Sequence, residues 1–253
     1  MSMTKNIPKT ELLYHKSKPI DHLNIFEGLA LMVEEHKNAA KEVEKTLKKI
    51  ESGIKDIIEH LQVHKTGRLI YVGAGTSGRI GVQDGVELFP TFNWPKDRVD
   101  FIIAGGPEAI LSSIENAEDN ILNAIKSVGN KKVNSQDVVI GLAASGNTPF
   151  TCKVLEQAMN KNALTIAISN NPNGKLLQYG KVKIVIDTKQ EIIAGSTRLK
   201  AGTAQKICLN IISSMVMIKM GFVKNGYMSN LVPTNKKLIK RKALIAKILK
   251  NEF

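Results

Sequence analysis

Two segments rich in glycine and hydroxyl residues each follow an apolar run and have the composition of phosphate-binding loops. They are GAGTSG, residues 73–78, and SGNTP, residues 145–149. In each, small residues let the backbone turn tightly, and Ser or Thr stands where a helix is expected to begin. The free backbone N–H groups and the positive dipole end of a helix start attract anions. If both loops lie at the carboxyl ends of parallel strands, they predict a crevice for one phosphorylated small molecule.

The first loop also matches the dinucleotide pattern G-x-G-x-x-G. A dinucleotide site requires in addition an acidic residue at the end of the second strand, which binds the ribose. The second strand-like run ends in IIAGG, residues 102–106, and its acidic residue, Asp100, lies at its start. A single compact phosphate therefore fits better than a pyrophosphate. A turn that binds no ligand is a reasonable alternative for either loop alone, and less so for both.

The side chains near the loops restrict the chemistry. All five histidines precede the first loop: His15, His22, His36, His60 and His64. Catalysis in the core must therefore use carboxylates, hydroxyls, Lys or Arg, unless the N-terminal segment or a partner subunit contributes. We interpret Cys152 and Cys208, which lie in predicted helices without metal-like spacing, as buried thiols of a reducing cytoplasm.

Strand-like and helical segments alternate along the chain. Strands are predicted at 69–72, 99–103, 138–142, 164–168 and 182–186, and helices at 77–88, 107–127, 148–160 and 199–220. A short helix over 23–35 and an amphipathic helix from Ala40 to Leu61 precede them. Such alternation predicts an α/β fold, a three-layer sandwich with a parallel sheet of about five strands and helices on both faces.

The length of 253 residues suits one α/β domain with appendages or two small domains. We expect an N-terminal helical segment, 1–64, which packs on the core or on a dimer partner. A core domain, 65–222, and a C-terminal loop with a basic helix, 223–253, follow. The longest apolar stretch, 207–220, is too short and too polar to span a membrane, and the first residues lack a secretory signal pattern. A cytoplasmic protein is expected.

The net charge of +13 is unevenly distributed. Residues 71–150 contain six Lys or Arg and nine Asp or Glu, whereas 236–250 contain seven basic residues and no acid. A nucleic-acid site would need several aromatic or Arg residues interleaved with the lysines, whereas 236–250 contain one Arg and no aromatic residue. We interpret the tail as a solvated helix face and expect neither a nucleic-acid nor a membrane partner.

Several motifs together carry a family resemblance. The longest is GSTRLKAGTAQK, residues 195–206, supported by GAGTSGR from Gly73, ENAEDN from Glu115, and Thr10-Glu11. At these residues the chain resembles sugar isomerase (SIS) domain proteins. More narrowly, it is similar to the N-acetylmuramic acid 6-phosphate etherases, relatives of the glucokinase regulatory protein. The resemblance extends from about Thr10 to Leu238.

The resemblance implies a lyase that needs no metal or redox cofactor. Such enzymes convert N-acetylmuramic acid 6-phosphate into N-acetylglucosamine 6-phosphate and D-lactate by elimination and then addition of water. This chemistry requires two carboxyl groups with separated pKa values. By resemblance Glu87 is the acid and Glu118 the base, with Glu115 an alternative base. Partial burial among apolar neighbours is expected to raise the pKa of Glu87.

The resemblance also implies a sugar-phosphate site and a homodimer with the site near its interface. N-terminal helices are expected to reach across to the second subunit. The expected binding residues come from both loops and from the long motif: Thr76, Ser77, Gly78, Ser145, Gly146, Asn147, Thr148, Ser196, Thr197, Arg198 and Lys200.

The chain departs from the family pattern in places. Asn147 stands where members carry Arg, and the residues around Glu87 and over 225–230 also differ. The altered 225–230 loop and the basic tail motivate an alternative, a non-catalytic sugar-phosphate sensor with a protein partner. An aldose–ketose isomerase on the same fold is a further, weaker alternative.

Overall fold

A five-stranded parallel sheet forms the centre of the molecule. The computed structural model describes residues 7–15, 18–233 and 236–250. The strands are arranged in the order β2-β1-β3-β4-β5. Their bounds are β1 Leu69–Gly73, β2 Val99–Ile103, β3 Val138–Ala143, β4 Leu164–Ser169 and β5 Val182–Val185. The predicted α/β class is confirmed, and each strand lies within one residue of its predicted bounds.

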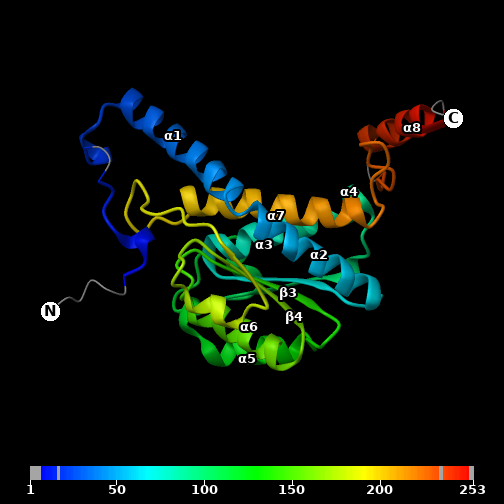
Figure 1. The fold of residues 1–253 in the computed structure, drawn as a ribbon, viewed down its shortest axis with the longest axis horizontal. Coiled ribbons are helices and arrows are strands. Elements are labelled where there is room, and N and C mark those ends of the chain that lie inside the picture. The colour runs from blue at the N-terminus through cyan, green and yellow to red at the C-terminus, as the bar shows by residue number, and fades with distance from the viewer. Residues whose placement is uncertain (1–6, 16–17, 234–235, 251–253) are drawn as a thin grey trace.

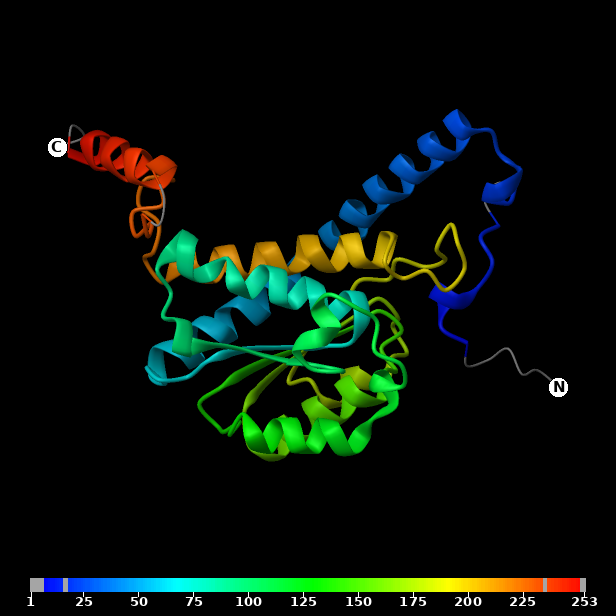
Figure 2. The same cartoon turned by 180° about the vertical axis from the view of Figure 1, so that it is seen from behind.

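Helices cover both faces of this sheet and complete a three-layer sandwich. One face carries α2 (Leu47–Val63), α3 (Gly75–Val86) and α7 (Lys200–Lys219), and the other carries α5 (Ile121–Asn130) and α6 (Pro149–Asn160) (Figures 1 and 2). Side chains alternate between two buried cores along each strand. Tyr71 and Ile140 lie in the core beneath α7, whereas Ile70 and Val139 lie in the core beneath α5 and α6.

The N-terminal helices differ in their bounds from the prediction. Helix α1 (Ile25–Glu44) begins at a capping box formed by Asn24 and Glu27, and continues nine residues beyond the predicted end at 35. The break before α2 comes at Lys45 and Thr46. The three-to-four residue apolar spacing continues across this break, so periodicity alone did not reveal it.

The helix predicted over 107–127 is wrong for its first half. This segment instead forms two 3-10 turns, η5 (Pro107–Ile110) and η6 (Ala117–Asp119), and only then α5. Asn116, inside this segment, has a φ of +57°, which is incompatible with a continuous helix. Asn120 then caps α5 by accepting the N–H of Asn123. Similarly, the helix predicted over 77–88 is α3 followed by the short α4 (Leu88–Phe92).

The remaining elements connect or flank these layers. They are η2 Lys9–Glu11, η3 Ile20–His22, η4 Lys96–Arg98, η7 Lys175–Tyr179 and α8 Lys236–Lys250. Helix α8 stands away from the body of the fold in both views (Figures 1 and 2). Residues 1–6 and 251–253 of the predicted first and last segments lie outside the described residues.

Among the described residues, α7 alone is long and apolar enough to cross a membrane by length and composition. However, 56% of its apolar window is buried inside this fold. Helix α7 therefore serves as the central helix of its layer.

Candidate active site

The two predicted phosphate-binding loops lie side by side. Strands β1 and β3 are hydrogen-bonded neighbours, with Gly73 in register with Leu142. The chain leaves β1 into α3 on one face and leaves β3 into α6 on the other. Residues 73–78 and 145–149 therefore flank the point where the strand order reverses. Open α/β sheets bind ligands at such a switch point.

Glycine is required where the first loop meets α3. A Cβ on Gly73 would lie 2.7 Å from the backbone nitrogen of Gly78, and Gly75 has a φ of +50°. This close packing aims the first turn of α3, with its unpaired N–H groups and the buried Ser77, at the switch point. Thr76 lies against the start of α7, because its Cγ2 is 3.3 Å from the position of a Cβ on Gly202.

The second loop is held by its own side chains. Ser145 Oγ accepts the N–H of Asn147 at 3.1 Å, and Asn147 Oδ1 accepts the N–H of Lys175 at 2.9 Å. Gly146 has a φ of +73°, and a Cβ there would lie 2.5 Å from Gly174. Asn147 therefore tethers η7 to the loop. Thr148 is half-buried at the start of α6.

The motif at 195–200 forms a turn that leads into α7. The N–H of Gly202 donates to the carbonyl of Thr197 at 2.9 Å, and Ser196 and Thr197 are half-buried while Arg198 is exposed. Neither hydroxyl caps α7. The carboxylate of Glu191 does so instead, accepting the backbone N–H groups of Lys200 and Ala201 at 3.0 and 2.8 Å. Burial raises the pKa of Glu191, although these two hydrogen bonds oppose the rise.

Lys200 is buried, and its ammonium pairs with the carboxylate of Glu35 on α1. Tyr14 Oη and Asn38 Nδ2 each donate to Glu35 at 3.0 Å. Burial alone would raise the pKa of Glu35, but the hydrogen bond and charge of Lys200, together with the hydrogen bonds from Asn38 and Tyr14, lower it overall. Desolvation, followed by the hydrogen bond to Glu35 and the charge of that carboxylate, raises the pKa of Tyr14 to about 12. Sequence reasoning found Lys200 but missed Glu35 and Glu191.

Glu118 lies on η6 and reaches the first loop. Its Oε1 is 3.2 Å from the position of a Cβ on Gly75. The preceding segment is held by Arg79, whose Nε donates to the carbonyl of Ala109 at 2.9 Å and whose Nη2 donates to that of Ser112 at 2.8 Å. Sequence reasoning assigned Arg79 no role, although its position in the GAGTSGR motif was a signal.

Glu87 lies at the other end of α3. Twelve residues separate it from Gly75, which corresponds to about 18 Å along the helix axis. Its side chain is exposed in the single chain, so the expected partial burial is wrong for one subunit taken alone. Glu87 and the first loop, which Glu118 contacts, therefore lie at opposite ends of α3.

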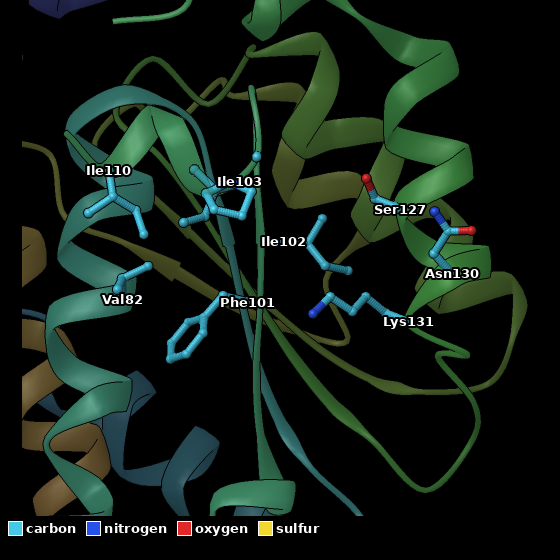
Figure 3. A pocket seen from close by; sticks show the side chains of 10 residues that line it. Val82, Phe101, Ile102, Ile103, Ile110, Ser127, Asn130 and Lys131 are labelled. Carbon is cyan, nitrogen blue, oxygen red and sulfur yellow. The ribbon is translucent and has the colours of Figure 1, made fainter. Parts of the chain in front are cut away.

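A cavity of about 290 Å³ lies elsewhere, beside the edge strand β2 (Figure 3). Its lining is mostly apolar and includes Val82, Phe101, Ile103 and Ile110. Its one cation, Lys131, pairs with Asp100 at 2.5 Å, and none of the expected site residues lines it. Its polar lining residues are Ser127, Asn130 and the already paired Lys131, and it lies apart from both phosphate-binding loops. Within the described ranges, no cluster of three His, Cys, Asp or Glu residues is arranged to hold a metal ion.

Comparison with protein families identifies two overlapping matches. Residues 40–159 match the family described as the glucokinase regulatory protein N-terminal SIS domain, and residues 123–224 match the SIS domain. Together they cover the sheet and both phosphate-binding loops.

Curated relatives match over most of the chain. It is 44% identical to an N-acetylmuramic acid 6-phosphate etherase of Clostridium beijerinckii over 229 residues, which are 90% of this chain and 75% of that protein. It is 43% identical to an N-acetylmuramic acid 6-phosphate etherase of Bacillus cereus over 242 residues, 94% of this chain and 80% of that protein.

Solved structures share the fold at low sequence identity. A protein of Escherichia coli CFT073 is 18% identical, with a TM-score of 0.57 over 81% of this chain and 97% of its own. Phosphoheptose isomerase of Neisseria gonorrhoeae is 15% identical, with a TM-score of 0.56 over 76% of this chain and 98% of its own. These structures support the assignment of the fold.

Proposed function

The chain belongs to the family of N-acetylmuramic acid 6-phosphate etherases, and from this premise we propose how its residues carry out the family's reaction. It is a carbon–oxygen lyase that converts N-acetylmuramic acid 6-phosphate into N-acetylglucosamine 6-phosphate and D-lactate, in amino sugar recycling. The observation that carries the residue assignments is the meeting of two phosphate-binding loops at the switch point, with Glu118 beside the first.

The phosphate is bound at the starts of α3 and α6. Backbone N–H groups and the hydroxyls of Ser77, Ser145 and Thr148 donate hydrogen bonds to the phosphate oxygens. Thr76, Gly78 and Gly146 shape the two loops. The turn at 196–198 approaches from the side of α7, next to Thr76. Its Arg198 is available for the carboxylate of the lactyl group.

Glu118 acts as the base. Its carboxylate removes the C2 proton of the ring-opened sugar, and the bond between C3 and the lactyl oxygen breaks. The electron pair of the C2–H bond forms the new C2–C3 double bond. Glu87, in its protonated form, gives its proton to the departing lactate oxygen. Water then adds to C3, and the C2 position regains a proton, which restores the saturated sugar.

The site is shared between two subunits of a homodimer. A single chain separates Glu87 from the loops by about 18 Å along α3, so a second subunit must bring its own Glu87 to the Glu118 of the first. An exposed apolar face supports such a dimer. Ile25 and Phe26 on the protruding part of α1 are 84% and 80% exposed (Figure 1).

We place this dimer in the cytoplasm. Both cysteines are free and buried, which suits a reducing compartment. The substrate is a phosphorylated sugar, and its anionic phosphate prevents free passage across a bilayer. Fractionation of cells that produce the full chain checks this location, and recovery with the membrane pellet after a salt wash would contradict it.

The first test is an assay of D-lactate released from N-acetylmuramic acid 6-phosphate. Wild type is expected to release lactate, whereas Glu87→Gln and Glu118→Gln are each expected to lose at least about 100-fold in kcat. Thermal shift with the substrate serves as the folding and binding control for each variant. A folded wild type that binds the phosphosugar without releasing lactate would favour the sensor alternative instead.

A further inference from the structure

The start of α7 is fixed by two buried carboxylates that belong to different parts of the chain. Glu191 accepts the backbone N–H groups of Lys200 and Ala201, and Glu35 accepts the side-chain ammonium of Lys200. The side chains of Lys200 and Glu35 are only 5% and 4% exposed. Lys200 is therefore held at both its backbone and its side chain.

Two other side chains also hold the carboxylate of Glu35. Tyr14 Oη and Asn38 Nδ2 donate to its carboxylate at 3.0 Å each. These contacts fill part of the hydrogen-bonding capacity of the carboxylate and limit its rotamers. The carboxylate of Glu35, on α1, is therefore already oriented to bind Lys200, the first residue of α7.

The anchored residue lies next to the phosphate-binding machinery. The carbonyl of Thr197 accepts the N–H of Gly202, two residues after Lys200. A Cβ on Gly202 would lie 3.3 Å from both that carbonyl and Thr76 Cγ2. A displacement of Lys200 would therefore move the turn at 196–198 relative to the first loop.

We propose that Glu35 is a positioning residue that, through Lys200, holds the turn at 196–198 against Thr76 in the sugar-phosphate site. The role assigned to that turn rests on the proposed function. The ammonium of Lys200 therefore binds Glu35 and not the substrate. Glu35 acts on the affinity for the sugar phosphate and does not take part in proton transfer.

A charge-removal series tests the role of this pair. Glu35→Gln and Lys200→Met each leave one buried charge without its partner, whereas the double variant Glu35→Gln/Lys200→Met removes both charges. Glu34→Gln is the matched control, because Glu34 is the neighbouring carboxylate on α1 and forms only exposed ion pairs, with Lys37 and Lys41. The readouts are kcat and KM for lactate release, and the dissociation constant for N-acetylglucosamine 6-phosphate.

Each single variant is expected to raise KM and the product dissociation constant by about 10-fold or more, with kcat within about threefold of wild type. The double variant is expected to recover wild-type affinity to within about threefold, because no lone charge remains buried. Glu34→Gln is expected to match wild type. Recovery in the double variant separates positioning from direct contact, since a variant without the ammonium cannot replace a lost contact to substrate.

Two results would overturn the proposal: a Glu35→Gln protein with wild-type affinity, or a folded double variant as weak as Lys200→Met. If the single variants do not fold, Glu35→Asp, which keeps the charge but shortens its reach to Lys200, takes their place. It is expected to raise the product dissociation constant with kcat within about threefold of wild type, and wild-type affinity would overturn the proposal. Binding of the product does not require catalysis. A wild type that binds product without releasing lactate would refute the lyase function and leave this test intact.

Discussion

Glu118 and Glu115 are close in sequence but occupy different positions at the site. Glu118 extends to within contact distance of the first loop, at Gly75. Glu115 precedes Asn116, whose positive φ of 57° turns the chain before η6 begins. The two carboxylates therefore do not share a helical face. Contact with the loop favours Glu118 as the base.

This difference predicts unequal effects of the same substitution. Glu118→Gln is expected to lower kcat by about 1,000-fold, because a positioned base contributes roughly that much, while Glu115→Gln stays within about threefold of wild type. Exchange of the C2 proton with deuterated solvent provides a second measurement. Loss of exchange in Glu115→Gln, with retention in Glu118→Gln, would transfer the role to Glu115.

The buried pair of Glu35 and Lys200 predicts a pH-dependent contribution to stability. The folded pKa of Glu35 is below its ordinary value of 4.5, so its stabilisation is complete above 4.5 and is lost as the pH falls through the folded pKa. The free energy of unfolding should therefore be higher for wild type than for Glu35→Gln at about pH 6, with a smaller gap at about pH 3.5. Urea denaturation at constant chain concentration measures both. A gap that is unchanged or wider at the lower pH would contradict the assigned ion pair.

At the scale of elements, burial explains which segments the sequence could reveal. Strands β1, β3 and β4 are buried along their whole length and appear in sequence as short apolar runs bounded by loop residues. The glycine and hydroxyl loops that follow β1 and β3 were predictable for the same reason, since each stands directly after such a run. Local composition was sufficient for these parts of the site.

Elements whose form depends on a few backbone angles were not predictable in this way. The segment at 107–120 has helix-forming residues, but the positive φ of Asn116 divides it into turns. The partners of Lys200 were also out of reach, because Glu35 is 165 positions away in sequence. Such a contact exists only after α1 has packed along α7.

Arg79 links two of these elements, and its removal should separate binding from catalysis. Its planar guanidinium reaches the carbonyls of Ala109, Ile110 and Ser112 from α3, and so holds the segment that leads to Glu118. Arg79→Lys keeps the charge but cannot span these acceptors. We expect kcat to fall by about 10- to 100-fold, with product affinity within about threefold. An equal loss in affinity would show that Arg79 binds the sugar phosphate itself.

At the scale of the whole molecule, the length of α3 determines how the site is assembled. The helix places its first turn at the phosphate-binding loops and Glu87 at the far end. Helix α1 extends beyond the sheet and exposes apolar side chains that no described part of the chain covers (Figures 1 and 2). The proposed two-fold dimer would account for both features, because each subunit would cover the apolar face of the other and supply its Glu87.

Such a shared site predicts complementation between two inactive variants. In a hybrid dimer of Glu87→Gln with Glu118→Gln, one site combines the intact Glu118 of the first chain with the intact Glu87 of the second. The other site carries both substitutions. Random pairing in a co-expressed mixture makes half of the dimers hybrids with one active site each, so lactate release should recover to about a quarter of the wild-type rate. Each variant expressed alone should stay inactive. A co-expressed mixture that is as inactive as the separate variants would mean that Glu87 and Glu118 of the same chain act in one site. The dimer would then have to act by changing the shape of α3 rather than by contributing Glu87.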